Sequence, residues 1–387
     1  MSAADSERAA FELVRELTVP PRNPRGRREG YTTGACAAAA AGAACLVLEH
    51  NARPESFAVR SPLGFDIEIA VNSLAGGRGW ARAGVVKDGG DDPDVTHGAE
   101  VTATVRRVSE TGIHIQGGEG VGVITQPGLE LPPGSAAINP IPRRMIRESV
   151  GAVLGADHPA PGIEVVVSIP RGGELAKKTL NSRLGIVGGL SILGTTGVVR
   201  PMSTASWRAS VVQAIDVASA NCMRHIVLTT GGRSERFARG LYPALPDMAF
   251  VQMGIFTGES LDRCVTCGVS RVTLGGMIGK LAKLAKGQWQ THVAAGEVDV
   301  AFLAELALES GATTELVAQI VGANTARHVE DIVKSVVFTS YFDAIVNAVL
   351  LRCVERAQGL LDVECLLFDF DGEVLARAFE PRREKLP

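Results

Sequence analysis

The chain has 387 residues, of which 46% are hydrophobic, 21% charged and 5% aromatic, and its formal net charge is −3. This length favours two domains, and the composition is ordinary for a globular protein. The small net charge and the lack of a long basic run argue against a nucleic-acid binder. Seven cysteines in so long a chain do not predict a disulfide framework, so we expect reduced, mostly buried thiols in a cytoplasmic protein.

Residues 1–29 are charged and rich in proline, without the apolar segment that a secretory signal requires. We expect a flexible lead-in here, with helical character over 7–17 and a solvated basic cluster at Arg25, Arg27 and Arg28.

The longest apolar run, residues 35–48, is rich in alanine and interrupted by Gly42. It is shorter than the roughly 20 residues that a membrane-spanning helix needs, so it predicts a packed core helix and no membrane association. Thr32 or Thr33 could cap this helix, because a threonine side chain can accept a hydrogen bond from the first helical N–H groups.

The first half of the chain predicts an α+β domain over residues 30–193. Residues 65–69 and 101–105 alternate apolar and polar side chains, as half-buried strands do. Residues 143–154 have a helical pattern, and the β-branched run over 163–169 predicts a fully buried strand.

The second half, residues 194–387, predicts an α/β domain with a mainly parallel sheet flanked by helices. Short apolar strands alternate with helices, and this alternation is typical of a parallel sheet. The expected strands are at 226–228, 249–251 and 269–274. A long helical region over 297–359 follows, and residues 363–378 predict a closing hairpin with Asp371–Gly372 as its turn.

Residues 87–98 form an aspartate-rich segment, Lys-Asp-Gly-Gly-Asp-Asp-Pro-Asp-Val-Thr-His-Gly. Its carboxylates repel one another unless cations, backbone N–H groups or water offset them. The spacing does not fit a calcium loop, and Pro93 interrupts it. A ligand-binding loop and a solvated turn both remain open.

A second segment follows the predicted strand at 163–169 and runs to about residue 185. Loops at the carboxyl ends of such strands commonly bind ligands. Several basic residues would together suit a polyanionic small molecule. They are Arg171, Lys177, Lys178 and Arg183, with Arg143, Arg144 and Arg200 as further candidates.

A third segment, residues 229–235, lies between a predicted strand and a predicted helix. Free N–H groups at the start of a helix attract anions. Residues 275–280 follow another strand in the same way. The chain has no dinucleotide-binding fingerprint and no phosphate loop, and Cys264 and Cys267 lack the second ligand pair of a zinc site. These patterns predict an enzyme or binding module with a cleft for an anion, and they leave the reaction open.

Several motifs taken together resemble one family, the cobalt-precorrin-5B C1-methyltransferases, or CbiD family. The motifs are GYTTGACAAAA at 30–40, the aspartate-rich segment at 87–98, AINP at 137–140, RLGIVGGLSILGTTG at 183–197, and GKLAKL at 279–284 with His292. Two positions depart from the family pattern: Ile255 replaces an expected acidic residue and Ser182 an expected proline.

The resemblance implies a reaction and its reactants. A methyl group would pass from S-adenosylmethionine to ring carbon C1 of cobalt-precorrin-5B, giving cobalt-precorrin-6A in the cobalt-early, anaerobic cobalamin pathway. The partner would be an anionic tetrapyrrole whose cobalt arrives with the substrate, so no protein-bound metal is implied. Homo-oligomers and hand-over from neighbouring corrin-pathway enzymes are left open.

The resemblance and the patterns above also give candidate site residues. Those expected at the catalytic centre are Asp91, Asp94 and His97. Those expected to bind substrate are Thr32, Thr33, Lys87, Asp88, Asp92, Arg171 and Arg183. Those expected to hold the cofactor are Thr230, Gly231, Gly232, Arg233, Glu235 and Gly279.

Two other classes of function fit the same residues. A metal-dependent hydrolase or kinase could use the aspartate-rich segment, and a non-catalytic tetrapyrrole- or nucleotide-binding module could use the same cleft. Turnover that requires magnesium would distinguish the first, and binding without turnover the second.

Overall fold

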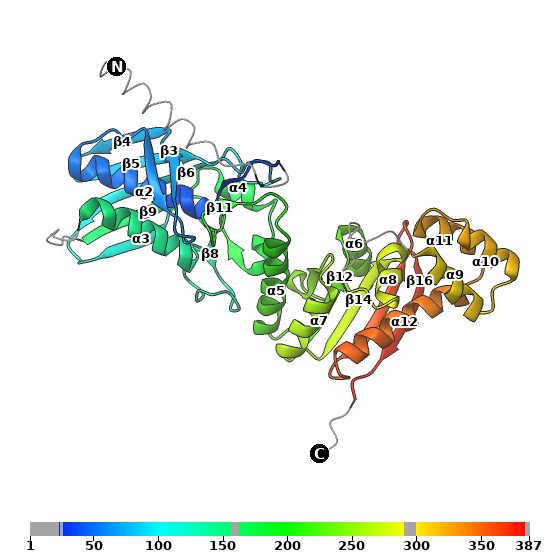
Figure 1. The fold of residues 1–387 in the computed structure, drawn as a ribbon. Coiled ribbons are helices and arrows are strands. Elements are labelled where there is room, and N and C mark those ends of the chain that lie inside the picture. The colour runs from blue at the N-terminus through cyan, green and yellow to red at the C-terminus, as the bar shows by residue number, and fades with distance from the viewer. Residues whose placement is uncertain (1–22, 24–25, 156–161, 290–298, 384–387) are drawn as a thin grey trace, which may run out of the picture. The chain divides into compact units, whose positions relative to one another are not determined.

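The computed structural model describes residues 23, 26–155, 162–289 and 299–383. In it the chain forms two compact units, Met1–Ser203 and Thr204–Pro387 (Figure 1). Each unit has a hydrophobic core of its own. The predicted mixture of helices and sheets is confirmed.

The main sheet of the first unit has five strands in the order β4-β5-β6-β9-β7. These are β4 (Ser73–Gly77), β5 (Trp80–Val86), β6 (Glu100–Val108), β9 (Gly162–Ser168) and β7 (Ile113–Gly117). All neighbours are antiparallel except β7 and β9. The strands at 101–105 and 163–169 were expected from alternation and from a β-branched run, and both are present.

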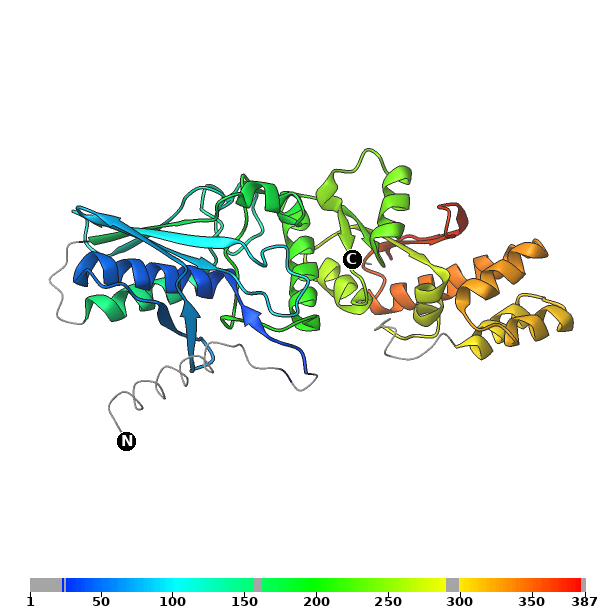
Figure 2. The ribbon, with the colours of Figure 1, turned by 90° about the horizontal axis from the view of Figure 1, so that it is seen from above.

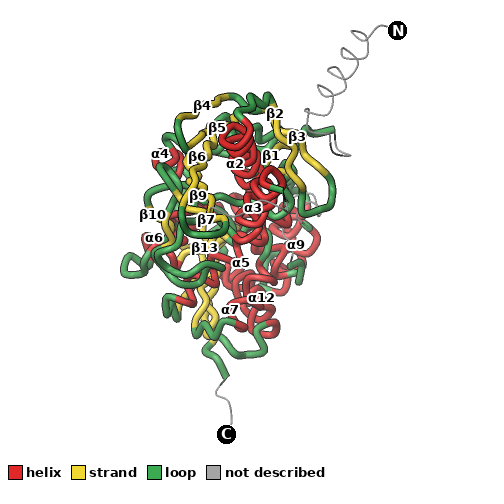
Figure 3. Tube along the Cα trace, turned by 90° about the vertical axis from the view of Figure 1, so that its left-hand side faces the viewer, coloured by secondary structure: helices red, strands yellow, loops and turns green. Residues whose placement is uncertain are grey.

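Two helices cover one face of this sheet, α2 (Thr33–His50) and α3 (Pro140–Leu154), and they form one layer beside the strands (Figures 2 and 3). The alanines of α2 are fully buried, because small side chains let the helix lie close to the strands and to α3. The predicted core helix is confirmed, although it extends beyond residues 35–48. By length and composition alone α2 could cross a membrane, but 72% of its most apolar stretch is buried inside the unit.

Shorter elements complete the first unit. They are the hairpin β2 (Ser56–Arg60) and β3 (Asp66–Ala70), the pairs β1 (Gly30–Tyr31) with β11 (Val198–Val199) and β8 (Val123–Ile124) with β10 (Ile186–Val187), and the short helices α4 (Gly172–Ala176) and η1 (Asn181–Leu184). The expected domain boundary at 193/194 lies before the observed division at 203/204, because β11 pairs with β1 and holds this stretch in the first unit.

The second unit contains a five-stranded sheet in the order β13-β12-β14-β15-β16. The first four strands are parallel to one another, and β16 pairs antiparallel with β15. The strands are β12 (His225–Thr229), β13 (Phe250–Gln252), β14 (Arg271–Met277), β15 (Asp362–Phe368) and β16 (Val374–Glu380). The closing hairpin expected over 363–378 is present.

The helices of the second unit pack on this sheet or on one another. They are α5 (Thr204–Ala220), α6 (Gly232–Leu241), η2 (Asp247–Ala249), α7 (Thr257–Thr266), α8 (Ile278–Ala285), α9 (Val300–Glu309), α10 (Thr314–Val321), α11 (Ala326–Ser335) and α12 (Ser340–Arg356). The last four account for the long helical region expected over 297–359. The helix expected at 7–17 lies outside the described residues.

Candidate functional site

Three segments that are far apart in sequence meet in the first unit. The backbone N–H of Tyr31 donates to the carbonyl of Asp88 at 2.7 Å, and that of Thr32 donates to Gly197 at 3.0 Å. The N–H of Gly34 donates to Leu193 at 2.8 Å. The motif at 30–34 therefore lies between the aspartate-rich segment and the glycine-rich stretch at 193–197, and these segments form the aspartate site of the first unit.

Glycines allow the motif at 30–34 and the aspartate-rich segment to approach each other closely. A Cβ atom on Gly30 would overlap the backbone of Gly89. Gly90 has a φ of +65°, and a Cβ there would overlap the carbonyl of Arg28. Lack of space excludes a side chain at both positions, and at Gly90 the positive φ favours glycine as well.

Asp88 and Asp94 hold the aspartate site together. Asp88 forms an ion pair with Arg28 and accepts the N–H of Gly90 at 2.9 Å. Asp94 accepts Lys87 Nζ at 2.6 Å. Burial raises the pKa of both carboxyl groups, but these donors more than offset it, so each pKa lies below its usual value. Both are therefore anchored anions.

Asp91 and Asp92 accept hydrogen bonds from backbone groups on either side of the segment. Asp91 Oδ2 accepts the N–H of Arg28 at 2.7 Å, and Asp92 Oδ1 accepts the N–H of Met202 at 2.8 Å. All four aspartates thus have partners in their own unit, which offsets their mutual repulsion. Within the described ranges no group of three His, Cys, Asp or Glu side chains is arranged to hold a metal ion.

One ring nitrogen of His97 accepts a hydrogen bond, and none of the described residues bonds the other. Its Nδ1 accepts the N–H of Gly89 at 3.0 Å, so the proton of the neutral ring resides on Nε2. The side chain is 54% exposed. In this tautomer the Nε2–H of His97 is a hydrogen-bond donor. The ring could accept a proton at Nδ1 only after its hydrogen bond from the N–H of Gly89 is broken.

The other residues expected to bind substrate in this site are turned toward the protein. Thr32 caps α2 by accepting the N–H of Ala35 at 3.1 Å. Thr33 accepts the N–H of Leu193 at 2.8 Å. The side chain of Lys87 is only 1% exposed. These three residues position the segments, and any part they have in binding substrate remains a prediction.

The basic residues expected along 168–185 have different surroundings. Arg171 has a φ of +63°, is the N-cap of α4 and forms an exposed ion pair with Glu174 at 3.2 Å. Arg183 lies in η1. Arg143 donates to three backbone carbonyls, which makes it a structural residue and not part of an exposed basic surface.

The residues expected to hold the cofactor lie at one edge of the second sheet. Since β12 and β14 are parallel neighbours, the segments that follow them emerge at the same edge. Thr230 N–H donates to the carbonyl of Gly275 at 3.1 Å, and Lys280 donates to the carbonyl of Thr230. Burial lowers the pKa of Lys280. Gly279 lies in the first turn of α8.

The start of α6 is open in part. Nothing lies within 4 Å of a Cβ placed on Gly231, so this turn leaves space beside the backbone. Glu235, in contrast, is buried and pairs with Arg239 at 2.8 Å. Thr230, Gly231 and Gly232 are therefore better placed to meet a cofactor than Glu235 is.

Some residues of these sites were not found from the sequence. Arg28 was assigned to the flexible lead-in, but it pairs with Asp88 and anchors Asp91 through its N–H. Its position two residues before the motif at 30–34 was the available signal. Nothing in the sequence indicated that Arg327 and Phe370 would meet at the edge of the second sheet. His292 lies outside the described residues.

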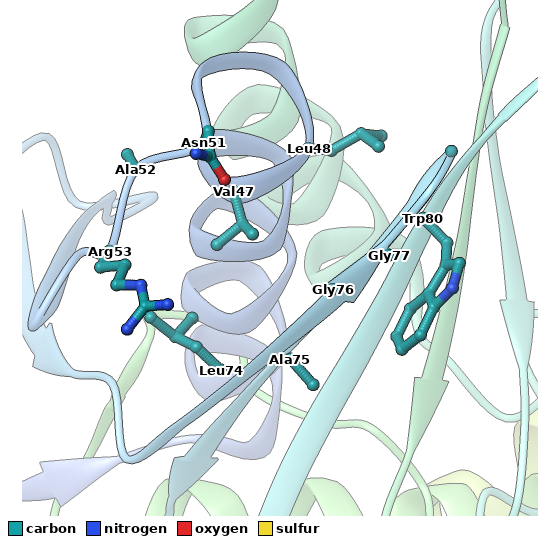
Figure 4. Close-up of a pocket in the computed structure, with 11 residues that line it drawn as sticks. Val47, Leu48, Asn51, Ala52, Arg53, Leu74, Ala75, Gly76, Gly77 and Trp80 are labelled. Atoms are coloured by element: carbon teal, nitrogen blue, oxygen red, sulfur yellow. The ribbon is translucent and has the colours of Figure 1, made fainter.

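A groove of about 550 Å³ lies at the end of α2 beside the β4–β5 hairpin (Figure 4). Asn51, Arg53, Leu74 and Trp80 are among the residues that line it. It contains no residue of the aspartate site.

Known proteins match most of this chain in sequence. A family model described as CbiD matches residues 21–201, and one described as the CbiD C-terminal domain matches residues 290–379. The chain is 48% identical over 353 residues to a protein of Geobacillus kaustophilus (strain HTA426) named cobalt-precorrin-5B C(1)-methyltransferase, covering 91% of this chain and 95% of that protein. It is 52% identical over 305 residues to a protein of the same name from Salinispora arenicola (strain CNS-205), covering 79% and 80%.

A solved structure is similar as well, that of a cobalamin biosynthesis protein (cbiD) from Archaeoglobus fulgidus. It has 31% sequence identity and a TM-score of 0.38, and the match covers 74% of this chain and 85% of that one. The two family models and these relatives lead to one conclusion: the chain belongs to the CbiD family.

Proposed function

We propose that this protein transfers a methyl group from S-adenosyl-L-methionine to carbon C1 of cobalt-precorrin-5B, giving cobalt-precorrin-6A in the cobalt-early, anaerobic route to cobalamin. The observation that supports this most is the 48% identity, over 91% of the chain, to a protein named cobalt-precorrin-5B C(1)-methyltransferase. The cobalt belongs to the substrate, and the reaction would take place in the cytoplasm.

The main task of the protein in this reaction is to hold the methyl donor and the acceptor carbon in the correct relative position. The methyl sulfonium of the donor supplies an activated methyl group, and its C–S bond breaks as the new C–C bond forms. Holding the two reactants in line and away from water is worth about 7–11 kcal/mol. The rigid hydrogen bonding of the aspartate site suits it to hold a reactant in one orientation, because its carboxylates are already fixed by Arg28, Lys87 and backbone N–H groups.

His97 is the aspartate-site side chain best placed to contact substrate. With Nδ1 held by Gly89, its exposed Nε2–H would donate to a substrate carboxylate or carbonyl oxygen. Asp88 and Asp94 are poor bases because their donors hold their pKa values low. A proton released from the substrate after methyl transfer would therefore pass to solvent or to a base other than Asp88 and Asp94.

The cofactor would bind at the edge of the second sheet. Free N–H groups at the start of α6 and the open space beside Gly231 fit the carboxylate of the methionine part. Thr230, Gly231, Gly232, Arg233 and Gly279 are the residues expected to line this site. Arg171 and Arg183 remain candidates for the peripheral carboxylates of the tetrapyrrole.

The decisive experiment combines purified protein, S-adenosylmethionine and enzymatically generated cobalt-precorrin-5B, followed by mass spectrometry of the pigment. We expect addition of one methyl group that requires both protein and cofactor. A reaction without protein is the control for spontaneous change of the substrate.

Other outcomes would favour other functions. Tetrapyrrole binding without methyl transfer, by intact protein and with verified substrate, would support a binding module. Magnesium-dependent hydrolysis of a nucleotide that is lost in Asp91→Asn would support a hydrolase or kinase. A need for a neighbouring pathway enzyme would support direct hand-over of an unstable substrate.

A further inference from the structure

Two guanidinium groups share one phenyl ring at the edge of the second sheet. The Cζ atom of Arg327 lies 4.4 Å from the ring centroid of Phe370, and that of Arg233 lies 5.5 Å from the same centroid. Arg233 comes from α6 and Arg327 from α11, so two helices distant in sequence direct positive charge to one point, the start of the β15–β16 hairpin turn (Figure 1).

The ring is held firmly. Asp369 Oδ1 accepts the N–H groups of Asp371, Gly372 and Glu373 at 2.7–2.9 Å, which closes the turn around Phe370. Gly372 has a φ of +104°, and a Cβ there would be 2.7 Å from the Phe237 ring of α6. The turn is therefore packed against α6 and keeps Phe370 at a fixed position.

The charge of Arg327 is offset only in part by Glu330, whose pKa burial raises to about 7. Lys334 is neutralised by Asp369 at 2.8 Å, whereas neither Arg233 nor Arg327 has an ion pair or side-chain hydrogen bond in the part of the chain that the structure describes. Asp371 and Glu373 belong to the same turn but pair with neither. Two exposed guanidinium groups that converge in this way gain from an anion that binds both.

Their location is suited to a ligand. The carboxyl ends of β12, β14 and β15 share this edge of the parallel sheet, where open α/β sheets bind ligands. Arg233 and Arg327 both lie in the first turn of their helices, where backbone N–H groups add positive potential.

We propose that Arg233 and Arg327, resting on Phe370, form a carboxylate-binding site of the second unit. The chemical class rests on the proposed function, because both reactants of that reaction carry carboxylates. Each planar guanidinium group can bind a carboxylate with two parallel hydrogen bonds. The pair of arginines therefore suits a ligand with one or more carboxylates. The carboxylate comes either from the methionine part of the cofactor or from the acetate and propionate groups of the tetrapyrrole.

The test compares Arg233→Gln and Arg327→Gln with Arg236→Gln as the matched control. Arg236 lies on the same helix as Arg233, and its guanidinium lies 5.5 Å from the Phe237 centroid and not over Phe370. Two probes separate the sources: S-adenosylhomocysteine, measured by calorimetry, and uroporphyrin, an octacarboxylate tetrapyrrole, measured by fluorescence. Thermal unfolding of each variant verifies that it is folded.

We expect Arg233→Gln and Arg327→Gln each to weaken one probe by about 10- to 100-fold, the effect of a charge-assisted bond of about 1.5–3 kcal/mol. Arg236→Gln should stay within about twofold. Loss for S-adenosylhomocysteine alone assigns the site to the cofactor, and loss for uroporphyrin alone assigns it to the tetrapyrrole. Higher salt should weaken the same probe in the wild type.

Two results would overturn the proposal in different ways. If the wild type transfers methyl groups but both variants bind both probes as it does, or Arg236→Gln loses as much, the carboxylate site is wrong and the proposed function stands. If the wild type binds neither probe and transfers no methyl group, both are wrong.

Discussion

At the scale of single residues, one arginine organises much of the aspartate site. Arg28 pairs with Asp88 through its guanidinium, and its N–H donates to Asp91. Its carbonyl accepts the N–H of Asp91 at 2.9 Å. Carboxylates that would repel one another in an isolated peptide are thereby each given a donor, so the charges order the segment.

We expect Arg28→Gln to lower the free energy of unfolding by about 1–2 kcal/mol, because Asp88 would lose a charged partner in a half-buried setting. Chemical denaturation measures this. The matched control is Arg60→Gln, whose ion pair with Asp66 at 3.0 Å is mostly exposed and should contribute less than about 0.5 kcal/mol. Equal effects of the two changes would contradict an organising part for Arg28.

Substitutions of His97 separate its hydrogen bond to Gly89 from the outward Nε2–H that would donate to substrate. In His97→Asn the side-chain oxygen can still accept the N–H of Gly89, but the outward Nε2–H is lost. We expect this variant to keep its stability within about 0.5 kcal/mol and to lose at least about tenfold in kcat. His97→Ala should lose both stability and kcat. Full activity in His97→Asn would mean that His97 only supports the loop.

Glu364 predicts a pH dependence in the second unit. Its buried carboxylate accepts from Thr273, Tyr242, Arg271 and Arg377. Burial raises its pKa, but these donors outweigh burial and lower the pKa to about 2 from 4.5. Because the folded-state pKa is depressed, the stabilisation is present above pH 4.5 and is lost as pH falls toward 2.

Glu364→Gln should therefore destabilise the protein by about 3 kcal/mol at pH 7 and by progressively less below pH 4.5. Urea denaturation at a series of pH values measures the difference between variant and wild type. Burial lowers the pKa of His225 to about 4 and the Glu364 carboxylate partly opposes this, so His225 titrates in the same pH range and contributes to the difference between variant and wild type. A pH-independent difference would contradict the assignment.

At the scale of elements, the packing of α2 decides the effect of its glycine. A Cβ on Gly42 would overlap the Phe57 ring of β2, whereas nothing lies within 4 Å of one on Gly151 in α3. Alanine is the better helix former at both positions by about 1 kcal/mol, so propensity alone predicts stabilisation at both.

We expect the glycine-to-alanine substitutions in the two helices to change the free energy of unfolding in opposite directions. Gly151→Ala should stabilise the protein by about 0.5–1 kcal/mol. Gly42→Ala should destabilise it by about 1–3 kcal/mol, because Phe57 must move out of a filled space. Thermal unfolding of both variants checks this. Stabilisation by Gly42→Ala would show that α2 can shift away from β2 at little cost.

At the scale of the whole molecule, each unit has its own core and its own sheet. We expect Gly42→Ala to speed amide hydrogen exchange throughout the first unit and to leave the β12–β14–β15 strands of the second unchanged, because their hydrogen bonds and core lie within that unit. Mass spectrometry of peptic peptides measures the exchange of each unit separately. Equal acceleration in both units would mean that they unfold as one cooperative body.

The sequence by itself determined the parts that depend on local patterns. The run of small side chains predicted the core helix α2, alternation and β-branched runs predicted β6 and β9, and the spread of motifs indicated the family. Such features follow from side-chain type and period, so a single stretch of chain contains them.

Only the tertiary structure decided which groups meet. Asp88 and Arg28 are 60 positions apart, Asp92 accepts a hydrogen bond from Met202, and Arg327 and Arg233 both lie by the ring of Phe370. Glu235, expected at the cofactor site, proved to be buried against Arg239. Contacts of this kind depend on the path of the chain through two sheets, because the electrostatic partner of a side chain is set by distance in space and not by distance in sequence.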